Sequence, residues 1–281
     1  LVTYRYTDSF NNFADCSFEV IVVDDEDPSI VCPTDVTVDS EPGIDGISSA
    51  LVALGIPVSE DNCSSTSINN NAPLIFPVGE TIVIWTVTDG SGNQATCEQR
   101  VTVLDNENPG IICPAAIIVS AEQGKCEINA LHVDLGEPEI TDNSGIAEVT
   151  NDAPETYPVG TTIVTWTVID IYGNTSTCEQ MVTVRDDENP IIECPANKWV
   201  ANEPGTCGVA LSSLILREPV AYDNCGVTSI QKVAPERLWI GKNIIKWIVT
   251  DVNGNEAICR QEIKVIDFED PTIICPPDIV V

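Results

Sequence analysis

Histidine is almost absent from this sequence, and basic residues are scarce. His132 is the single histidine among 281 residues, so Ser–His–Asp and Cys–His catalytic arrangements are nearly excluded. Lysine and arginine number 12 against 44 aspartates and glutamates, and the net charge is −32. Nucleic acids and anionic membranes are poor partners for such a chain, because like charges would meet. Divalent cations are its natural partners, although an acidic surface also serves plain solubility.

Other absences narrow the class of protein further. No Cys-x-x-Cys pair occurs, so metal sites built from thiolates are not expected. No apolar run is long enough to cross a bilayer, so no membrane span is predicted. No glycine-rich phosphate loop is present, and the recurring carboxylates lie at linkers rather than in a cleft, which argues against glycosidase chemistry. We therefore predict that the chain is not an enzyme.

An 81-residue period dominates what is present. The recurring positions are Cys16, Cys97, Cys178 and Cys259; Cys32, Cys113, Cys194 and Cys275; Trp85, Trp166 and Trp247; and Pro28, Pro109, Pro190 and Pro271. The period defines repeats at 24–104, 105–185 and 186–266. Residues 1–23 match the C-terminal part of a preceding repeat, and 267–281 match the start of a following one. No signal peptide opens the chain, so we expect an internal piece of a longer protein.

Strand signals fill each repeat. Segments such as 81–88 and 177–184 are rich in β-branched residues that largely alternate with other residues. Between two such segments lies an Asp-x-x-Gly-Asn turn, as at 170–174. Aromatic residues make up only 5%, which suits several small aliphatic cores. The pattern predicts an all-β chain of tandem immunoglobulin-like antiparallel β-sandwiches, with Trp85, Trp166 and Trp247 in their cores.

The order of short motifs in each repeat resembles the hyalin repeat (HYR) family. In the first repeat these motifs are Cys32-Pro33, Asp61-Asn62-Cys63, Phe76-Pro77-Val78-Gly79, the segment 83–93 and Thr96-Cys97. The resemblance implies an immunoglobulin-like fold, an extracellular location and a role in adhesion. Repeat 3 departs from it at Trp239-Ile240-Gly241, an apolar replacement in a turn.

Twelve cysteines at fixed spacings indicate disulfides and an oxidising, extracellular compartment. In a sandwich of this type the first and last strands can run parallel along one edge, so the two cysteines that open these strands can pair. We predict the bridges Cys32–Cys97, Cys113–Cys178 and Cys194–Cys259, each worth roughly 4 kcal/mol in the chain-entropy model. Cys16 and Cys275 would be halves of bridges whose partners lie outside the chain.

The remaining cysteines are less regular. Within repeat 3 we expect Cys207 to pair with Cys225. Cys63 and Cys126 then lack partners, and either they are free buried thiols or they bridge laterally packed chains. A third pairing, Cys63–Cys97 with Cys113–Cys126, abandons the constant spacing.

Each repeat begins with an acidic Asp-x-Glu-x-Pro linker, which suggests a calcium site at the domain junction. The linker candidates are Asp25, Asp27, Asp105, Glu107, Asp186, Glu188, Asp267 and Glu269. The turn candidates are Asp89, Asn93, Asp170, Asn174, Asp251 and Asn255. A third, less secure set consists of the Asp-Asn pairs that begin at Asp61, Asp142 and Asp223. A Cys207–Cys225 bridge would place the third set nearer the opposite pole, so the two inferences conflict. The alternative is a merely solvated linker followed by an ordinary turn.

These features favour a stalk or filament segment of an extracellular, cell-surface adhesin, stiffened by calcium. Its partners would be neighbouring repeats, like chains packed laterally, carbohydrate or surface proteins. The alternatives are a carbohydrate- or protein-binding module and an accessory region of a secreted enzyme. We recognise no surface patch that distinguishes one repeat. Asn62 and Asn174 lie in glycosylation sequons, and His132 belongs to no recurring site.

Overall fold

The computed structural model describes residues 1–276, and in this range the chain is all β. No α-helix occurs among these residues, and three single-turn 3-10 helices are the only helical segments there. None of them is long and apolar enough to cross a membrane. The prediction of tandem β-sandwiches is confirmed. The predicted following fragment, 267–281, lies partly outside the described residues.

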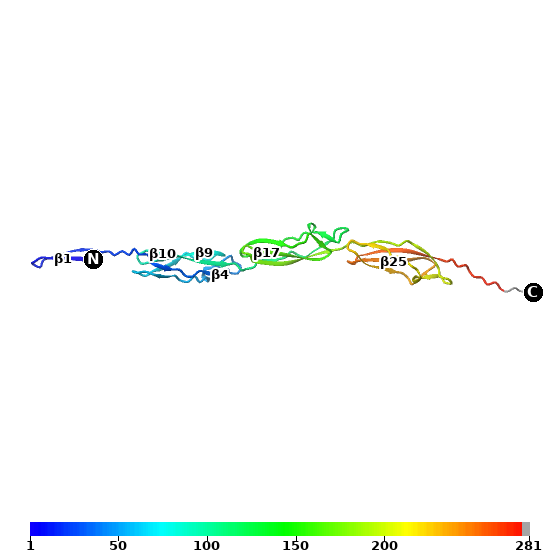
Figure 1. Cartoon of the computed structure of the whole chain (residues 1–281), viewed down its shortest axis with the longest axis horizontal. Coiled ribbons are helices and arrows are strands. Elements are labelled where there is room, and N and C mark those ends of the chain that lie inside the picture. Colours follow the sequence, from blue (N-terminus) through cyan, green and yellow to red (C-terminus); the bar gives the residue numbers. More distant parts are fainter. Residues whose placement is uncertain (277–281) are drawn as a thin grey trace, which may run out of the picture. The chain divides into compact units, whose positions relative to one another are not determined.

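Repeat 1 is a sandwich of one four-stranded sheet and two short strand pairs. Its elements are β3 (Ser29–Val31), β4 (Val36–Asp39), β5 (Ile47–Ser48), η1 (Ser49–Leu51), β6 (Val58–Glu60), β7 (Ser67–Asn70), β8 (Ile75–Phe76), β9 (Gly79–Thr88) and β10 (Gln94–Leu104). The larger sheet has the order β4-β10-β9-β7, and the opposite layer consists of β3-β6 and β5-β8. Strands β4, β9 and β10 lie side by side in Figure 1.

Repeats 2 and 3 have the same arrangement. Repeat 2 contains β11 (Gly110–Ile112), β12 (Ile117–Ser120), β13 (Glu127–Asn129), η2 (Ala130–His132), β14 (Glu139–Thr141), β15 (Ile146–Asn151), β16 (Thr156–Pro158), β17 (Gly160–Asp170) and β18 (Thr175–Arg185). Repeat 3 contains β19 (Ile191–Glu193), β20 (Lys198–Ala201), β21 (Gly208–Ala210), η3 (Leu211–Ser213), β22 (Val220–Tyr222), β23 (Val227–Val233), β24 (Arg237–Trp239), β25 (Gly241–Asp251) and β26 (Glu256–Ile266). Their large sheets run β12-β18-β17-β15 and β20-β26-β25-β23.

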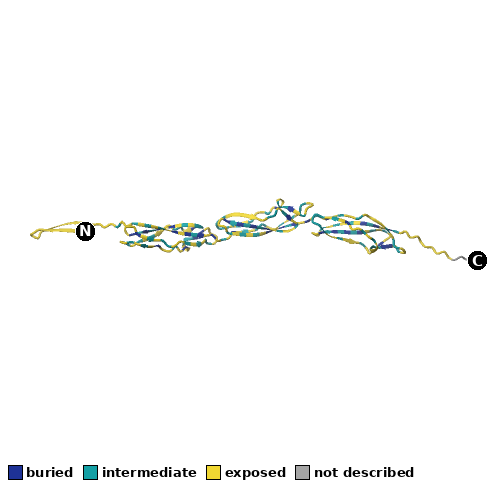
Figure 2. Ribbon diagram, viewed as in Figure 1, coloured by how far each residue is buried: buried dark blue, intermediate teal, exposed yellow. Residues whose placement is uncertain are grey.

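The long hairpin of each repeat supplies most of the core. Along β9 the buried residues Val83, Trp85 and Val87 alternate with more exposed ones, as the period-2 pattern predicts. Trp85 packs in one cluster with Ile47 and Phe76 of the opposite layer. Figure 2 shows this burial as dark blue segments within each repeat. The buried side chains of these strands therefore form a separate hydrophobic core in every repeat.

Each core tryptophan is hydrogen-bonded to a buried glutamine on the neighbouring strand. Trp166 is 7% exposed, and its Nε1 donates to Oε1 of Gln180 at 3.0 Å. Gln180 Nε2 donates in turn to the backbone oxygens of Ala115 and Leu135. The pairs Trp85–Gln99 and Trp247–Gln261 repeat the contact. The prediction that these tryptophans are core residues is confirmed.

A parallel pairing at one edge of each large sheet explains the evenly spaced disulfides. Strand β4 pairs parallel with β10, with Val36 opposite Val101, and β12 and β20 pair likewise with β18 and β26. The structure contains the bridges Cys32–Cys97, Cys113–Cys178 and Cys194–Cys259, each with a sequence separation of 65. Each bridge ties the start of its repeat to the last strand of that repeat.

The segment 1–23 forms only a hairpin. Strands β1 (Val2–Thr7) and β2 (Phe13–Phe18) pair with Tyr4 opposite Cys16. Tyr4 occupies the position of the core tryptophans but is 66% exposed, because no second sheet layer covers it.

The described chain divides into two compact units rather than three. One unit comprises 1–111, 140–149 and 168–176, and the other comprises 112–139, 150–167 and the described residues from 177 onward. The division runs through repeat 2. Each of the two complete junctions between repeats therefore lies inside one unit.

Candidate cation sites at the repeat junctions

The linker aspartate is buried at each complete junction. Asp105 and Asp186 are 7% and 6% exposed. In each residue Oδ1 accepts the backbone N–H of the linker glutamate two residues later, at 3.0 Å and 3.1 Å. The other oxygen, Oδ2, is buried and has no hydrogen-bond partner. Each linker thus holds one carboxylate oxygen without a donor.

A second aspartate comes from the loop that follows β14 or β22. Oδ2 of Asp142 accepts the backbone N–H groups of Ser144 and Gly145 at 2.9 Å and 2.7 Å. Oδ2 of Asp223 accepts equivalent bonds from Cys225 and Gly226. These bonds make a tight loop and fix the carboxylate. In both residues Oδ1 is buried and unpartnered.

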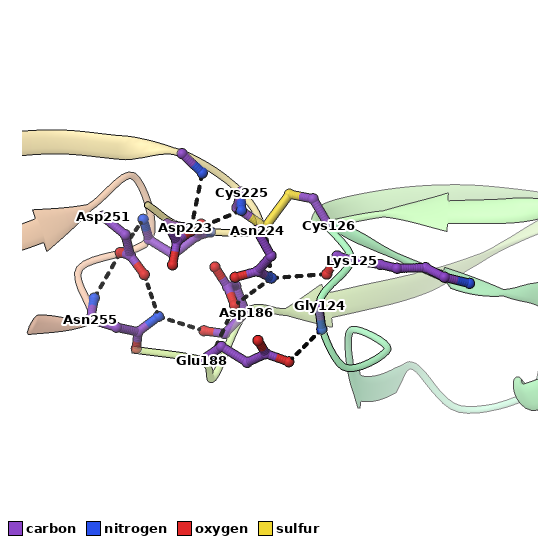
Figure 3. The surroundings of a disulfide bond; sticks show 12 residues. Gly124, Lys125, Cys126, Asp186, Glu188, Asp223, Asn224, Cys225, Asp251 and Asn255 are labelled. Atoms are coloured by element: carbon purple, nitrogen blue, oxygen red, sulfur yellow. Dashed lines mark hydrogen bonds between the residues drawn. A yellow bond between two sulfur atoms is a disulfide. The ribbon is translucent and has the colours of Figure 1, made fainter. Parts of the chain in front are cut away.

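The asparagine beside it completes the set. Nδ2 of Asn224 donates to the backbone oxygen of Lys125 in repeat 2 at 2.9 Å and to Oδ1 of Asp186 at 3.2 Å. Asn143 makes the equivalent bonds to Ile44 and Asp105, both at 3.4 Å. Because Nδ2 faces the preceding repeat, Oδ1 is left buried without a donor in both asparagines. Figure 3 shows these side chains gathered at the junction of repeats 2 and 3.

Three oxygens per junction are therefore buried and unpaired, and they are the same three atoms at both junctions. They are Asp105 Oδ2, Asp142 Oδ1 and Asn143 Oδ1, and then Asp186 Oδ2, Asp223 Oδ1 and Asn224 Oδ1. A buried unpaired polar atom costs about 1–3 kcal/mol, and more when it is charged. Carboxylates of Asp186 and Asp223 offer ligand atoms within 4.8 Å of each other, and Asp24, Asp61 and Asp89 form a similar group at the start of repeat 1. Such a set of hard oxygens can hold a divalent cation.

The Asp-x-x-Gly-Asn turn positions the linker. Asp89 Oδ1 accepts the N–H groups of Ser91, Gly92 and Asn93, and Asn93 Nδ2 donates to Asp89 Oδ2 and to the backbone oxygen of Asp24. Burial raises the pKa of Asp89, but these hydrogen bonds outweigh it and hold the pKa below its ordinary value. The turn carboxylate therefore stays ionised and holds the turn against the linker.

The turns of repeats 2 and 3 repeat this geometry. Asn174 Nδ2 donates to the backbone oxygen of Asp105 at 3.1 Å, and Asn255 Nδ2 donates to that of Asp186 at 3.0 Å. Oxygens of Asp170 and Asp251 accept from the turn itself. Nδ2 of Asn174 also donates to Asp170, so a glycan on this nitrogen would leave one N–H for the two acceptors. Asn62 is exposed, and its glycosylation stays a prediction.

Three of the four linker glutamates face the preceding repeat instead of the unpaired oxygens, and the fourth, Glu26, accepts from Asn62 of its own repeat. Glu188 accepts the N–H of Gly124 at 2.8 Å, Glu107 that of Gly43, and Glu269 that of Gly205. Gly124 has φ +72°, which suits glycine in this tight loop. These glutamates thus dock a loop of one repeat onto the next linker.

The sequence pattern located the junction, but it missed one aspartate there. Asp24 takes the place of Asp105 in the first linker, and not Asp25 or Asp27. The asparagines Asn62, Asn143 and Asn224 belong to the Asp-Asn pairs that the sequence offered only as a less secure set. The 81-residue spacing, applied from Asp105, leads to Asp24 directly. Asp267 repeats only the linker bond, accepting from the N–H of Glu269.

A disulfide crosses the junction between repeats 2 and 3. Cys126, in a loop of repeat 2, is bonded to Cys225 in repeat 3, with their Cα atoms 4.9 Å apart. The predicted bridge Cys207–Cys225 is therefore wrong, and Cys126 is not a free thiol. Cys63 and Cys207 are unpaired and exposed. With this pairing the conflict over the third set disappears, because Asp223 and Asn224 face the linker together with Cys225.

Repeat 3 differs from its neighbours on the outer face of its large sheet. Lys246 lies directly opposite Arg260 on β25 and β26. Lys264 lies opposite Trp199, which is 71% exposed and whose ring centroid is 5.4 Å from the lysine Nζ. Like charges opposite one another destabilise a sheet pair. Glu262 on the same face is paired with Lys242, which leaves Lys246, Arg260 and Lys264 without a salt bridge there. Eight of the 12 basic residues lie in 186–266. Repeat 3 therefore carries a distinguishing basic face, contrary to the expectation from sequence.

Tandem disulfide-pinned β-sandwiches joined at acidic linkers define a modular repeat protein. The chain belongs to the HYR domain family, which matches residues 23–103, 104–184 and 185–265.

Relatives of this chain include two sea urchin proteins. It is 30% identical over its whole length to hyalin of Lytechinus variegatus, and 32% identical over 95% of its length to hyalin of Strongylocentrotus purpuratus. The chain spans 55% of the first relative and 23% of the second. Among solved structures, mouse cadherin-23 EC22-24 covers 86% of this chain, and all of that structure is matched, at 14% identity and a TM-score of 0.38.

Proposed function

We propose that this chain is a segment of an extracellular adhesive protein whose repeats act as spacers joined by calcium-binding junctions. The observation that carries the proposal is the set of three buried, unpaired oxygens that recurs at both complete junctions. Support for an extracellular setting comes from four disulfides, which persist in oxidising compartments. The hyalin relatives and the HYR repeats are consistent with a role in adhesion.

Calcium suits the junction better than other divalent cations. The donors are two carboxylates and one amide oxygen, all hard oxygens, supplied by a linker and a loop. Calcium accepts six to eight oxygens in irregular geometry, whereas magnesium demands a near-ideal octahedron. Zinc favours thiolate and imidazole, and Cys225 is held in a disulfide.

The physical role of the ion would be to fasten the linker to the following repeat. Two ionised carboxylates close together repel one another unless a cation lies between them. Asp186 belongs to the linker, and Asp223 belongs to a loop of repeat 3, so an ion shared by them would join both segments. A chain of repeats joined this way is a stiff spacer, and its partners are neighbouring repeats and, laterally, like chains.

Calcium binding can be tested junction by junction. We expect calorimetric titration of the full chain to lose one site in Asp105→Asn and another in Asp186→Asn, because each variant removes an unpaired carboxylate oxygen. Glu179→Gln is the matched control, since this exposed residue lies in the middle of β18 and its substitution loses the same charge. Equal calcium binding in all four proteins would refute the proposal.

The basic face of repeat 3 favours a second function, a binding module for an anionic polysaccharide. Lys246, Arg260 and Lys264 supply positive charge beside the exposed ring of Trp199, which can stack on a sugar. The equivalent positions in repeat 2 are Thr165, Glu179 and Thr183, which lack this charge.

Retention on an immobilised sulfated polysaccharide at about physiological salt tests this second function. We expect the triple variant Lys246→Glu, Arg260→Glu and Lys264→Glu to elute early. The control Arg185→Glu, Arg217→Glu and Lys232→Glu carries the same charge change elsewhere and should behave like the parent chain. If both triple variants elute alike, the retention is non-specific and the face is not a binding site.

A further inference from the structure

The disulfide Cys126–Cys225 joins two consecutive repeats, with a sequence separation of 99 between the cysteines. Cys126 lies in the loop before β13, at the pole of repeat 2 that faces repeat 3. In the same loop the Gly124 N–H donates to Glu188 of the next linker, and the Lys125 carbonyl accepts from Asn224 of repeat 3. Cys225 lies in the loop of repeat 3 that Asp223 closes. The bridge thus joins one loop from each of the two repeats that meet at the junction. Every complete repeat contains both kinds of loop.

Cys207 occupies the Cys126 position of repeat 3. In both loops a glutamate N–H bonds to the carbonyl five residues later at 2.9 Å, from Glu122 to Glu127 and from Glu203 to Gly208. Gly205 also repeats Gly124, with φ +72° and an N–H donated to the glutamate of the next linker, Glu269. Cys207 is therefore presented toward the following junction on a loop of the same conformation, where it is exposed and unpaired.

Cys63 occupies the Cys225 position of repeat 1. Asp61 Oδ2 accepts the N–H groups of Cys63 and Ser64 at 3.0 Å and 2.7 Å, as Asp223 does for Cys225 and Gly226. Cys63 is also exposed and unpaired. It lies on the preceding side of its repeat, in the loop whose Asn62 bonds to the linker residue Glu26.

We propose that Cys207 and Cys63 are the two halves of junction-crossing disulfides, each with a cysteine of an adjoining repeat as its partner. Cys207 pairs with a cysteine at the Cys63 position of a repeat that follows, and Cys63 pairs with a cysteine at the Cys207 position of a repeat that precedes. A junction is locked covalently where cysteines occupy both positions, and it is held by hydrogen bonds without a crosslink where they do not.

The junction between repeats 1 and 2 is an unlocked example inside the same chain. Its two positions hold Asp45 and Ser144, so no crosslink can form there. The hydrogen bonds from Asn143 to Ile44 and Asp105 are nevertheless made. The junction therefore assembles without the bridge. Whether a junction is crosslinked depends on whether cysteines occupy the two positions that Cys126 and Cys225 hold. This inference does not depend on calcium binding.

The chemistry is a balanced thiol–disulfide exchange. Two protein thiols and one molecule of oxidised glutathione give one protein disulfide and two molecules of reduced glutathione. An oxidising extracellular compartment supplies such a disulfide.

A lengthened chain tests the pairing. Inserting a second copy of residues 24–266 after Ile266 keeps the repeat register and gives Cys207 and the Cys63 of the added copy the same separation as Cys126 and Cys225. After refolding in a glutathione redox buffer, non-reducing peptide mapping should link the Cys207 peptide to the Cys63 peptide. The original chain should give this link only as a concentration-dependent intermolecular product. Separate peptides in a chain that forms Cys126–Cys225 would overturn the proposal.

The variant Asp45→Cys with Ser144→Cys provides an independent test in the original chain. We expect these two cysteines to be linked to each other, while Cys126–Cys225 and the bridges within repeats are retained. Asp45→Cys alone is the control and should leave one more free thiol. The Cys113–Cys178 peptide reports correct folding in every sample. If a folded double variant keeps both new thiols free, the two positions do not define a lock.

Discussion

At the scale of single residues, the two polar atoms of one side chain can have different roles, because one has a hydrogen-bond partner and the other has none. Asp223 uses one oxygen to close its loop and leaves the other buried and unpaired, and Asn224 donates through nitrogen while its oxygen is unpaired. The sequence shows only that an Asp-Asn pair recurs. Which oxygen lacks a donor depends on side-chain direction, which a one-dimensional pattern does not contain.

Glu122 shows how a single carboxylate organises the loop that carries Cys126. Its oxygens accept from Lys125, from the Asn129 backbone and from His132, and these contacts lower its pKa from 4.5 to about 2. A lowered folded-state pKa means that ionised Glu122 stabilises the loop. That contribution is complete above pH 4.5 and is lost as the pH falls through about 2.

We therefore expect the Glu122 carboxyl carbon to report an ionised group at about pH 3 in an NMR titration, since that pH lies above the folded-state pKa. In Glu122→Gln, exchange of the Asn129 amide should be faster at neutral pH and should lose its dependence on this titration. A midpoint near 4.5 in the parent chain would contradict the assigned contacts.

At the scale of elements, the long hairpin and the core glutamine hold each sandwich together. Alternation along β9, β17 and β25 was readable from the sequence because one face of a sheet is buried and the other is not. The glutamine was not recognised, because a polar residue in a strand reads as solvent-facing. It is buried since Trp166 and two backbone carbonyls satisfy its amide.

Gln180→Met should destabilise repeat 2 by about 2–4 kcal/mol, because it leaves the Trp166 N–H and two carbonyls without partners. Glu179→Met, on the exposed face of the same strand, is the control and should change stability little. Hydrogen exchange resolved by repeat measures the effect: protection should fall in repeat 2 alone. Unchanged protection there would show that the buried amide is dispensable.

At the scale of the whole molecule, charge and repetition act together. A net charge of −32 repels itself along the chain, and the linkers bring acidic side chains together at each junction. Cations at the junctions would offset part of that repulsion and also restrict bending between repeats.

Chelation should therefore make the chain more flexible. We expect EDTA to shorten the persistence length measured by microscopy and calcium to restore it. The double variant Asp105→Asn with Asp186→Asn should show a smaller response, because both complete junctions have lost a ligand. A persistence length that ignores EDTA would argue against ions as the source of stiffness, and the crosslink between repeats 2 and 3 would remain as a separate restraint.

The sequence by itself determined the period, the all-β class and the evenly spaced cysteine pairs within repeats, because these depend on alternation and spacing that every repeat preserves. Only the tertiary structure decided that Cys126 meets Cys225, that Asp24 lies beside Asp61 and Asp89, and that three oxygens at each complete junction have no donor. The reason is physical: those features arise where a loop meets a linker or where loops of two consecutive repeats come together. Proximity between segments far apart in sequence depends on how folded domains dock, and local patterning does not encode it.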